Sequence, residues 1–460
     1  MGTQAVRPAT TTPTAKGLPV VGLLPQVLRD PPAAFMQIAR QHPGAIVRAP
    51  IVGPFDLYVV TRPEHMQHIL QDNWRNYPKG EALWDALRAL LGNGLITSSG
   101  EDWVKNRRVL QPLFGAKRIA SLAGLMVSII DRSLSALGGH QTPVDLVEEM
   151  SVITQNVVLE TVFGTAIPRA EASRLAKALG VAMREINLRM MLFFLPKGVP
   201  LPGDKKLATA LAELDEGLLR LSAEHEAKGK ADGEDMLSLL RNARDPETGE
   251  GMSARQLRDE IVTMWTAGNE TTSTALAWFW MLLDKHPEVL AAVQAEVDEV
   301  LGDRTPTGED VPRLSYTKKA LLEAMRLYSP SWIIPRKCEK DDVVDGYRIP
   351  GGSNILIVQY ATHRDPDLWE DPERFDPERF SPERIEKRHR FAHLPFSGGP
   401  RVCIGMGFAM MEAQLIVAMT LQRFKLRFSP EQTLRYEPAA TLRPRGQVQV
   451  RFLKKAGKSA

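Results

Sequence analysis

The chain has 460 residues, of which 43% are hydrophobic and 25% are charged, a composition typical of a globular protein with a large core. Its 58 Lys and Arg residues against 55 Asp and Glu residues give a net charge of +3, too small for this length to indicate nucleic acid or a membrane surface as the main partner. Only two cysteines are present, which excludes a disulfide framework and a four-cysteine zinc site and favours a cytoplasmic protein.

The N-terminal segment MGTQAVRPATTTPTAK, residues 1–16, is rich in Thr, Ala and Pro and has no apolar core of the kind found in secretory signals. We expect this segment to be disordered and residues 17–460 to form a single domain. The apolar run after the segment is short and broken by Gly and Pro, so it predicts no membrane anchor. Residues 45–61 are β-branched and aromatic around a Gly-Pro break, which predicts a strand hairpin.

Most of the remaining chain is predicted to be helical. Apolar residues recur at intervals of three and four between about residues 63 and 240, as in LAGLMVSIIDRSLSAL, which is typical of amphipathic helices. Ser253 and Gln256 have the spacing of a capping box, and a helical pattern then continues without proline to His286. A helix of that length measures roughly 50 Å and would cross the whole molecule.

This long helix is expected to be buried in protein and not in lipid. Its apolar centre, residues 261–283, carries Asn269, Glu270 and a run of Thr, and such polar groups are costly in the middle of a lipid-exposed helix. Further along the chain, a Pro-Gly-Gly turn separates strand-like runs within residues 345–363. The strands are therefore expected in a few short regions of a mainly helical protein.

Cys403 lies in the glycine-rich stretch FSGGPRVCIG, directly before an apolar helical pattern that begins at about Gly405. A lone cysteine in such a loop can be a nucleophile, a redox thiol or a metal ligand. The N-terminus of a helix favours a thiolate through its dipole and its free amide groups. Glycines at positions 398, 399 and 405 would let the backbone approach a large flat object, and a haem is such an object.

Phe396, Gly399, Arg401, Cys403 and Gly405 have the spacing F-x-x-G-x-R-x-C-x-G, which resembles the haem-binding loop of the cytochrome P450 family. A chance match at five fixed positions has a likelihood on the order of one in ten thousand in a chain of this length. The resemblance implies a mainly α fold with small β-sheets, in which a long central helix lies over a haem and the cysteine loop lies beneath it. It also implies that Cys403 is the axial ligand of the haem iron and that the rest of this loop contacts the haem.

Glu323 and Arg326 lie three residues apart in EAMR and resemble the family's E-x-x-R motif. A bare E-x-x-R is a surface ion pair in most proteins. The downstream segment that contains Arg379 also has the family's spacing, at Trp369, Pro372, Phe375, Pro377 and Phe380. The resemblance therefore implies a buried structural network of Glu323, Arg326 and Arg379 behind the haem, in which the loss of one partner is severe.

The segment AGNETT, residues 267–272, lies midway along the predicted long helix. A Gly beside an acid and paired hydroxyl groups is costly in an otherwise apolar helix unless it serves a purpose. The segment resembles the family's A-G-x-[DE]-T-[TS] pattern. The resemblance implies that Thr271 hydrogen-bonds dioxygen or its water and that Glu270 connects this network to bulk protons. It also implies that Ala267 and Gly268 leave room for O2 and substrate.

The stretch WVKNR places Trp103 and Arg107 four residues apart, on one face of a helix. A W-x-x-x-R match is weak in isolation. The resemblance implies that both residues meet the haem propionates, as does Arg336, ten residues after the E-x-x-R arginine. Together with Arg401, these positions would supply three cations for two carboxylates in an apolar pocket. Cys338 lies just past Arg336 and is expected to be a buried thiol.

The chain is identified as a member of the cytochrome P450 family, and the resemblance implies a haem-thiolate monooxygenase, an oxidoreductase that inserts one atom of O2 into a hydrophobic small molecule. It implies haem b as the cofactor and electrons from NAD(P)H through a separate ferredoxin or flavodoxin with its reductase. The motifs are similar to those of eukaryotic members, but we expect a monomeric, bacterial-type enzyme in the cytoplasm. Four apolar segments could line the substrate pocket, at residues 81–95, 184–202, 329–335 and 437–442. They permit terpenoids, fatty acids, steroids or polyketides equally.

Two alternatives to a monooxygenase remain open at this point. One is a peroxygenase or isomerase on the same fold that uses peroxide, and the other is a non-catalytic haem protein that senses a gas or a hydrophobic ligand. The presence of both Glu270 and Thr271 favours the monooxygenase over either. Residues 386–390, EKRHR, together with Lys105 and Arg108, are expected to form a basic rim that attracts an acidic electron donor.

Overall fold

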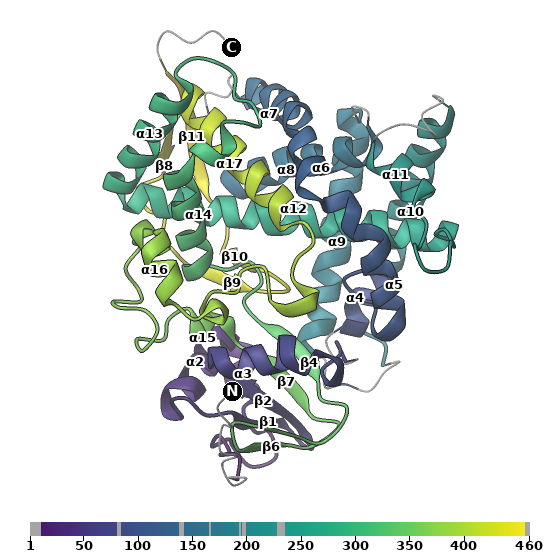
Figure 1. Cartoon of the computed structure of the whole chain (residues 1–460), viewed down its shortest axis with the longest axis vertical. Helices are drawn as coiled ribbons and strands as arrows, with labels where there is room; N and C mark the ends of the chain where they lie inside the picture. The colour runs from purple at the N-terminus through teal and green to yellow at the C-terminus, as the bar shows by residue number, and fades with distance from the viewer. Residues whose placement is uncertain are drawn as a thin grey trace.

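The computed structural model describes the chain at residues 11–80, 84–137, 142–164, 167–192, 195, 199–227 and 235–455. Helices dominate, and the strands form small sheets, as the sequence predicts (Figure 1). The helices are α1 Leu24–Arg29, α2 Pro31–Gln41, α3 Pro63–Gln67, α4 Trp84–Leu91, α5 Gly100–Leu110, α6 Ala116–Ser121, α7 Ala123–Leu137, α8 Leu146–Phe163, α9 Arg169–Met191, α10 Asp204–Ala227, α11 Met236–Asn242, α12 Ala254–Lys285, α13 Pro287–Leu301, α14 Ser315–Leu327, α15 Gln359–Thr362, α16 Pro382–Lys387 and α17 Met406–Arg423. The strands are β1 Val47–Val52, β2 Phe55–Val60, β3 Val144–Asp145, β4 Ile334–Lys337, β5 Asp342–Val344, β6 Tyr347–Ile349, β7 Asn354–Ile357, β8 Phe424–Phe428, β9 Tyr436–Pro438, β10 Leu442–Pro444 and β11 Gln449–Lys454.

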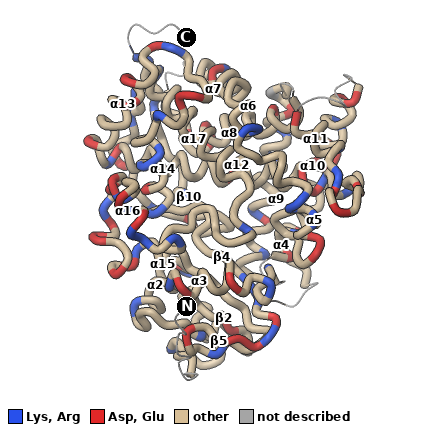
Figure 2. Tube along the Cα trace, in the orientation of Figure 1, with Lys and Arg blue, Asp and Glu red and all other residues tan. Residues whose placement is uncertain are grey.

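Charged residues of both signs are interspersed over the outline of the molecule in Figure 2, which agrees with the small net charge. Among the helices in the described ranges, none is both long enough and apolar enough to span a bilayer.

The predicted hairpin forms an antiparallel pair, β1 and β2, with Val47 opposite Val59. This pair belongs to a four-stranded sheet of order β1-β2-β7-β4, which lies at the lower end of Figure 1. The N-terminal segment also reaches this sheet, because Ala15 donates its amide hydrogen to the carbonyl oxygen of Arg48 at 2.8 Å and is 3% exposed. Residues 1–10 lie outside the described residues. The expected disorder therefore does not extend through Ala15, which the apolar cluster of the sheet buries.

The second predicted strand region divides between two sheets. The strand β6 pairs with β5 in a separate hairpin, whereas β7 runs parallel to β2 and antiparallel to β4. The glycine at position 352 in the turn between β6 and β7 has a φ of 83°, a backbone conformation that glycine adopts without steric cost. The turn thus sends the chain out of one sheet and into the other.

The long predicted helix is α12, which crosses the centre of the molecule in Figure 1. Ser253 caps its first turn by accepting the amide hydrogen of Gln256 at 3.2 Å. The side-chain N–H₂ of Gln256 donates to the side-chain oxygen of Asn106, which connects the start of α12 to α5. His286 follows the last turn of α12, at the residue where the sequence pattern predicts the end.

A fully buried ion pair joins α14 to the segment that precedes the cysteine loop. Glu323 and Arg326 have fully buried side chains, and Arg326 donates to the two carboxylate oxygens of Glu323 at 2.7 and 2.8 Å. The carboxylate also accepts the amide hydrogen of Asp376 at 2.9 Å and lies 3.3 Å from the guanidinium of Arg379. The three residues of the network that the sequence analysis assembled are therefore in contact. Since each charge has several partners, the burial of the network is compensated.

Arg326 continues this network towards the cysteine loop. It donates to the carbonyl oxygens of His363 and Pro372 at 2.6 and 2.7 Å. The His363 ring in turn accepts the amide hydrogen of Leu394 at 3.1 Å through Nε2, two residues before Phe396. Burial and the nearby guanidinium groups lower the pKa of His363 to about 3, so the ring is neutral and can accept this hydrogen bond.

Two acidic residues of α12 hold the loop that leads from α4 to α5. Asp259 accepts the amide hydrogen of Asn93 at 2.9 Å, and Glu260 accepts that of Leu95 at 3.0 Å. Glu260 is fully buried, and this burial raises its pKa to about 7, assisted by the charge of Asp259 and opposed by the amide of Leu95. The loop is therefore attached to α12 through a carboxyl group that titrates near neutral pH.

We expect Glu260 to make the fold less stable as the pH rises. Its pKa is about 7 in the folded protein against an ordinary value of 4.5, so the folded state binds more protons than the unfolded state between these values. The protonated carboxyl group stabilises the folded state by about 3 kcal/mol. This stabilisation is fully present below pH 4.5 and is lost as the pH rises through about 7. The variant Glu260→Gln keeps an acceptor for Leu95 and removes the titration.

Urea unfolding of the parent protein and of Glu260→Gln across this pH window is the measurement. The parent should lose free energy of unfolding relative to the variant as the pH rises. Glu299→Gln, at an exposed position of α13, is the matched control and should follow the parent. Parallel curves for the parent and Glu260→Gln would contradict the assignment.

Candidate functional site

One face of α12 is accessible although the helix is otherwise buried along its central turns. Met264, Ala267, Gly268 and Thr271 are partly exposed, whereas the residues between and beside them are mostly buried. Their spacing of three and four places them on one face of the helix. An accessible stripe on a central helix marks the wall of an internal space.

The cysteine loop lies between a short 3₁₀ turn, residues 399–401, and the start of α17. Cys403 donates its amide hydrogen to the carbonyl oxygen of Phe396 at 2.9 Å, which closes the loop. Gly399 has a φ of 68°, and a Cβ there would lie 1.9 Å from the carbonyl oxygen of Leu70, so only glycine fits. A Cβ at Gly405 would meet only Phe114, at 4.0 Å, which leaves space beside the first turn of α17.

The Cys403 side chain is accessible, yet protein atoms surround it closely enough to raise the pKa of its thiol. The amide of Gly405 and the charge of Arg107 act in the opposite direction but are the weaker effects. Desolvation therefore opposes the thiolate form that the helix N-terminus favours. A thiolate at Cys403 needs a bound cation, and metal ions deprotonate a coordinating thiol outright.

The cysteine loop and the accessible face of α12 belong to the same part of the core. Ile404, next to Cys403, and Met264 of α12 both pack against one apolar cluster. Three of the four segments predicted to line the substrate pocket also contribute to this cluster, through Leu87, Met190 and Ala440. Parts of two of these segments, residues 81–83, 193–194 and 196–198, lie outside the described residues.

Three cations lie close to one another near the loop without an acidic partner in the described chain, and of these Arg336 is buried whereas Lys79 and Arg401 are half-buried. Arg336, Arg401 and Lys79 make no ion pair with any residue that the structure describes. Burial lowers the pKa of Arg336 to about 9 and that of Arg401 to about 10, and Arg401 adds to the effect on Arg336. The pKa of Lys79 is also lowered, well below its ordinary value, by burial and by the two guanidinium groups. Such a cluster is stable only with a bound anion.

Lys79 was missed by the sequence analysis, and Trp84 was included only as part of the pocket segment at residues 81–95. Lys79 donates to the carbonyl oxygen of Ile96, and its ammonium lies 4.2 Å from the ring centre of Trp84. The indole N–H of Trp84 is buried without a partner in the described chain. Lys79 stands in the turn sequence YPKG, where a lysine is ordinarily on the surface, so no motif identified it. These donors and cations fit the two carboxylates of a haem.

Trp103 and Arg107 differ in their surroundings. Trp103 is 5% exposed and lies under the guanidinium of Arg401, 4.2 Å from its ring centre, which places it in the cation cluster. Arg107 instead donates to the carbonyl oxygen of Val402 at 2.9 Å, and its positive charge acts to lower the pKa of the Cys403 thiol. The structure therefore assigns Arg107 to the cysteine loop and does not place it with the other cations. Cys338 is a buried free thiol, as predicted.

The AGNETT segment does not bring its acid and its threonine together. The Thr271 hydroxyl donates to the carbonyl oxygen of Ala267 at 2.5 Å, whereas the Glu270 carboxylate accepts from Thr441 at 2.7 Å. Gly268 was expected to leave room for O2 and substrate, but a Cβ there would lie 2.8 Å from Val158 of α8. This glycine thus allows close packing of α12 against α8, and both Ala267 and Gly268 are partly exposed.

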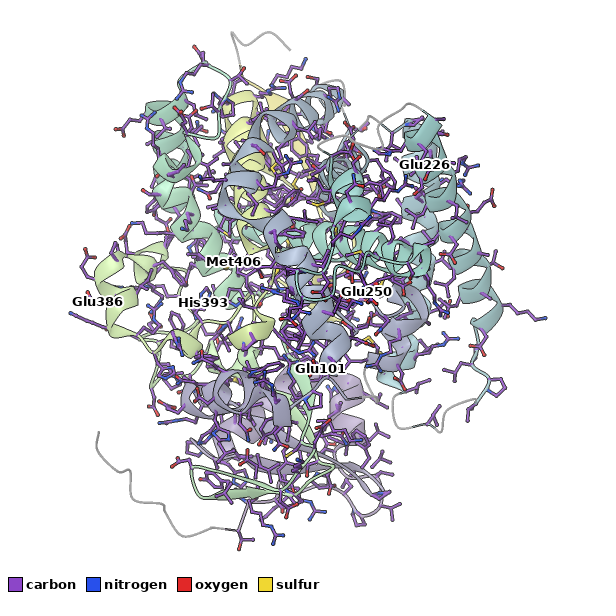
Figure 3. The ribbon with its side chains drawn as sticks, turned by 45° about the vertical axis from the view of Figure 1, so that its right-hand side comes forward. Glu101, Glu226, Glu250, Glu386, His393 and Met406 are labelled. Atoms are coloured by element: carbon purple, nitrogen blue, oxygen red, sulfur yellow. The ribbon has the colours of Figure 1, made fainter. Side chains whose placement is uncertain are left out.

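Two cations of the predicted basic rim, Lys105 and Arg108, are neutralised, whereas Lys387 and Arg390 of residues 386–390 are exposed and make no ion pair with any described residue. Lys105 pairs with Glu250, and Arg108 pairs with Asp245 at 2.7 Å and with Glu247. Arg388 lies 4.0 Å from the ring centre of Trp369 and donates to the carbonyl oxygen of Arg379 at 2.6 Å, so it is a structural residue. In the view of Figure 3, Met406 lies between Glu386 and Glu250, and its side chain is 44% exposed.

A surface groove of about 540 Å³ lies beside the cysteine loop. Pro400 of the loop lines one side, and Trp74 and Arg75 line another, with residues of α5. The guanidinium of Arg75 lies 4.6 Å from the ring centre of Trp74 and is exposed, and it forms no ion pair within the described parts of the chain. Arg75 is thus an uncompensated cation next to the loop that carries Cys403.

The comparisons with known proteins agree with this geometry. The family model for cytochrome P450 matches residues 12–452. The chain is 36% identical to cyclooctatin synthase and 37% identical to cyclooctat-9-en-7-ol 5-monooxygenase, both from Streptomyces melanosporofaciens, in each case over 93% of this chain and 92% of the relative. The crystal structure of the cytochrome P450DA haem domain superposes with a TM-score of 0.87 at 28% identity, covering 98% of this chain and 99% of that one. The chain therefore belongs to the cytochrome P450 family, and it is a monooxygenase that uses haem iron and O2.

Proposed function

We propose that this enzyme oxidises a cyclic terpenoid, with Cys403 as the ligand of its haem iron. Support for the terpenoid class comes from the relative that carries cyclooctat-9-en-7-ol in its name, which is 37% identical over 93% of this chain. The residues around the site are apolar and suit such a compound. The observation that carries the haem assignment is the accessible Cys403 thiol in the same loop as Arg401, which lies with Arg336 and Lys79 and, like them, has no acidic partner among the described residues.

The bound haem supplies the activation of O2 and the insertion of one oxygen atom. Cys403 would hold the iron, and a thiolate ligand favours cleavage of the O–O bond. Arg336, Arg401 and Lys79 would hold the two carboxylates. Their pKa values are lowered by burial, and an anion placed among them reverses that unfavourable effect.

The accessible face of α12 would border the reacting centre. The Thr271 hydroxyl, now bonded to Ala267 of its own helix, can rotate to donate towards that face. Glu270 would accept protons from solvent and pass them to Thr271 through water. Consecutive residues of a helix project about 100° apart, so the acid and the hydroxyl cannot touch directly.

Electrons would come from NAD(P)H through a separate ferredoxin or flavodoxin that docks over the groove beside Pro400. Such donors are acidic, and the uncompensated charge of Arg75 complements them. The ion pairs at Lys105 and Arg108 neutralise the α5 part of the rim that the sequence analysis proposed, and Lys387 and Arg390 keep its positive charge at residues 386–390. A monomeric state and a cytoplasmic location remain predictions.

Replacement of Cys403 by Ser should abolish the red-shifted Soret band that the reduced carbon monoxide complex shows when a thiolate ligates the iron. Serine lacks the polarizable sulfur that produces this band. Cys338→Ser is the matched control and should keep the band, since Cys338 lies in a separate apolar cluster. Survival of the band in Cys403→Ser, or its loss in Cys338→Ser, would overturn the ligand assignment.

Thr271→Val should divert electrons from product to hydrogen peroxide by roughly tenfold or more, because general acid steps contribute factors of about 10² to 10⁴. Haem content and ligand-induced Soret shifts should stay close to those of the parent. Thr272→Val removes a neighbouring hydroxyl that is buried away from the accessible face and should leave the ratio of peroxide to electrons unchanged. Equal ratios in the parent and in Thr271→Val would contradict the role of this residue.

Reversal of charge in Arg75→Glu should slow reduction by a surrogate ferredoxin roughly threefold to tenfold at low salt, with the difference vanishing at high salt. Stopped-flow reduction under both conditions measures this. Lys425→Glu makes the same change in net charge at an exposed position of β8 and should behave like the parent. If the two variants are equally slow, net charge and not the groove determines the rate.

A further inference from the structure

The orientation of Asn187 on α9 is fixed by the turn between β9 and β10, residues 439–441. The side-chain oxygen of Asn187 accepts the amide hydrogen of Ala440 at 3.0 Å. The turn is also held by α12, because the hydroxyl of Thr441 donates to Glu270 at 2.7 Å. Since the oxygen and the nitrogen of a side-chain amide point in different directions, the bond to Ala440 also determines where the N–H₂ of Asn187 points.

The N–H₂ group of Asn187 is buried and has no acceptor among the residues that the structure describes. Met183 and Met190 stand four residues before and three residues after Asn187, on the same face of α9. Met183 belongs to an apolar cluster and Met190 packs against it, so their side chains offer no good acceptor. A buried donor that lacks an acceptor is costly. The folded chain therefore leaves a polar group unsatisfied at this position.

The apolar cluster beside this donor is the one that borders the proposed site. Ala440 packs against it, as do Met264 of the accessible face of α12 and Ile404 of the cysteine loop. Methionine side chains are flexible and fill irregular space, so a ligand atom can reach the donor without movement of the backbone. A ligand that occupies the site can thus meet the N–H₂ of Asn187.

The fold explains only one half of this side-chain amide. The amide of Ala440 needs an acceptor at position 187, and the carboxylate of an Asp would supply one equally well. A bound water is a poor partner for the N–H₂ group, because a buried water needs about two to four polar neighbours. Ligand sites, in contrast, are mostly apolar and contain a few polar groups that fix the orientation of the ligand. The unpaired donor of Asn187 has the character of such a group.

We propose that the N–H₂ group of Asn187 donates to an oxygen atom that the substrate already carries, either a hydroxyl or a carbonyl oxygen. The proposal rests on the proposed function, because it takes the substrate to be a cyclic terpenoid. A site built to hydrogen-bond an oxygen of its substrate rejects the analogue without that oxygen, since the buried polar group is then left unpaired. Asn187 would therefore select oxygenated terpenoids over terpenoid hydrocarbons.

This selection places the enzyme after another reaction. An earlier step must put the first oxygen on the terpenoid skeleton, either by hydroxylation or by capture of water during cyclisation. The product of the present enzyme then carries at least two oxygen atoms, of which one comes from O2.

Ligand-induced Soret shifts of the haem-loaded protein measure this preference directly. The probes are p-menthane, menthone and menthol, which share one carbon skeleton and differ only at one oxygen. We define the oxygen preference as the Kd of p-menthane divided by the Kd of the oxygenated probe. Asn187→Leu removes the donor and should lower this preference about tenfold to a hundredfold for both oxygenated probes, the factor that corresponds to one buried donor left unpaired.

Asn187→Asp is a second variant that retains an acceptor for the amide of Ala440 and removes only the donor. It should lose the preference for menthone, whose carbonyl oxygen can only accept a hydrogen bond. It should keep a preference for menthol, because a hydroxyl can donate to the new carboxylate. Asn156→Asp makes the same change on α8, where the side chain donates to Ser133 of α7 at 3.4 Å, and should match the parent.

Thermal unfolding gives a readout that does not depend on the haem spectrum. A ligand that binds only the folded protein raises Tm by mass action. At equal concentrations, menthone should raise the Tm of the parent and of Asn156→Asp more than p-menthane does. In Asn187→Leu the two probes should raise Tm equally.

The outcomes separate this inference from the proposed function. If the parent binds p-menthane as tightly as menthone, or if Asn187→Leu keeps the oxygen preference of the parent, the role of Asn187 is wrong and the terpenoid class still stands. If none of the three probes shifts the Soret band or the Tm of the parent, the terpenoid class fails and this inference fails with it.

Discussion

The buried contact between Glu323 and Arg326 is the interaction on which the position of the cysteine loop depends. Both charges are fully removed from water, and each is compensated by several partners from other segments. The guanidinium reaches the backbone of His363, and the ring of that residue holds Leu394 just before the loop. A single pair on α14 is thus connected through two further bonds to the segment that presents Cys403. Because an unpaired buried charge is far more costly than an exposed one, this geometry has few alternatives.

Sequence patterns were most informative where local chemistry determines the structure. The hairpin at β1 and β2, the start and end of α12 and the mainly helical content follow from spacing, capping and turn residues, whereas the fold itself was implied by the resemblance to the cytochrome P450 family. The E-x-x-R network could be assembled because its members stand in a fixed pattern. Lys79 could not be identified in this way, since a lysine in a turn becomes buried only through the tertiary fold.

The remaining differences arise from competition between partners that lie far apart in the sequence. Glu270 was expected to serve Thr271, its neighbour in sequence, but it bonds Thr441, 171 positions later. Lys105, Arg108 and Arg388 of the proposed rim find acids or an aromatic ring that no local pattern indicates. Burial, likewise, raises the pKa of the Cys403 thiol against the effects of the Gly405 amide and the charge of Arg107. In each case the local inference was reasonable, and a non-local contact or desolvation was stronger.

The cluster of Lys79, Arg336 and Arg401 has a consequence for how the protein matures. Desolvated cations that lie beside one another destabilise the segments that carry them. The two carboxylates of a haem would remove this destabilisation. A haem that binds only the folded protein stabilises it by mass action. Folding and haem binding are therefore linked equilibria. Haem is then a counter-ion within the core as well as a reagent. A cell that makes this chain faster than it makes haem would accumulate incompletely folded protein, and the yield of mature enzyme would follow the supply of haem.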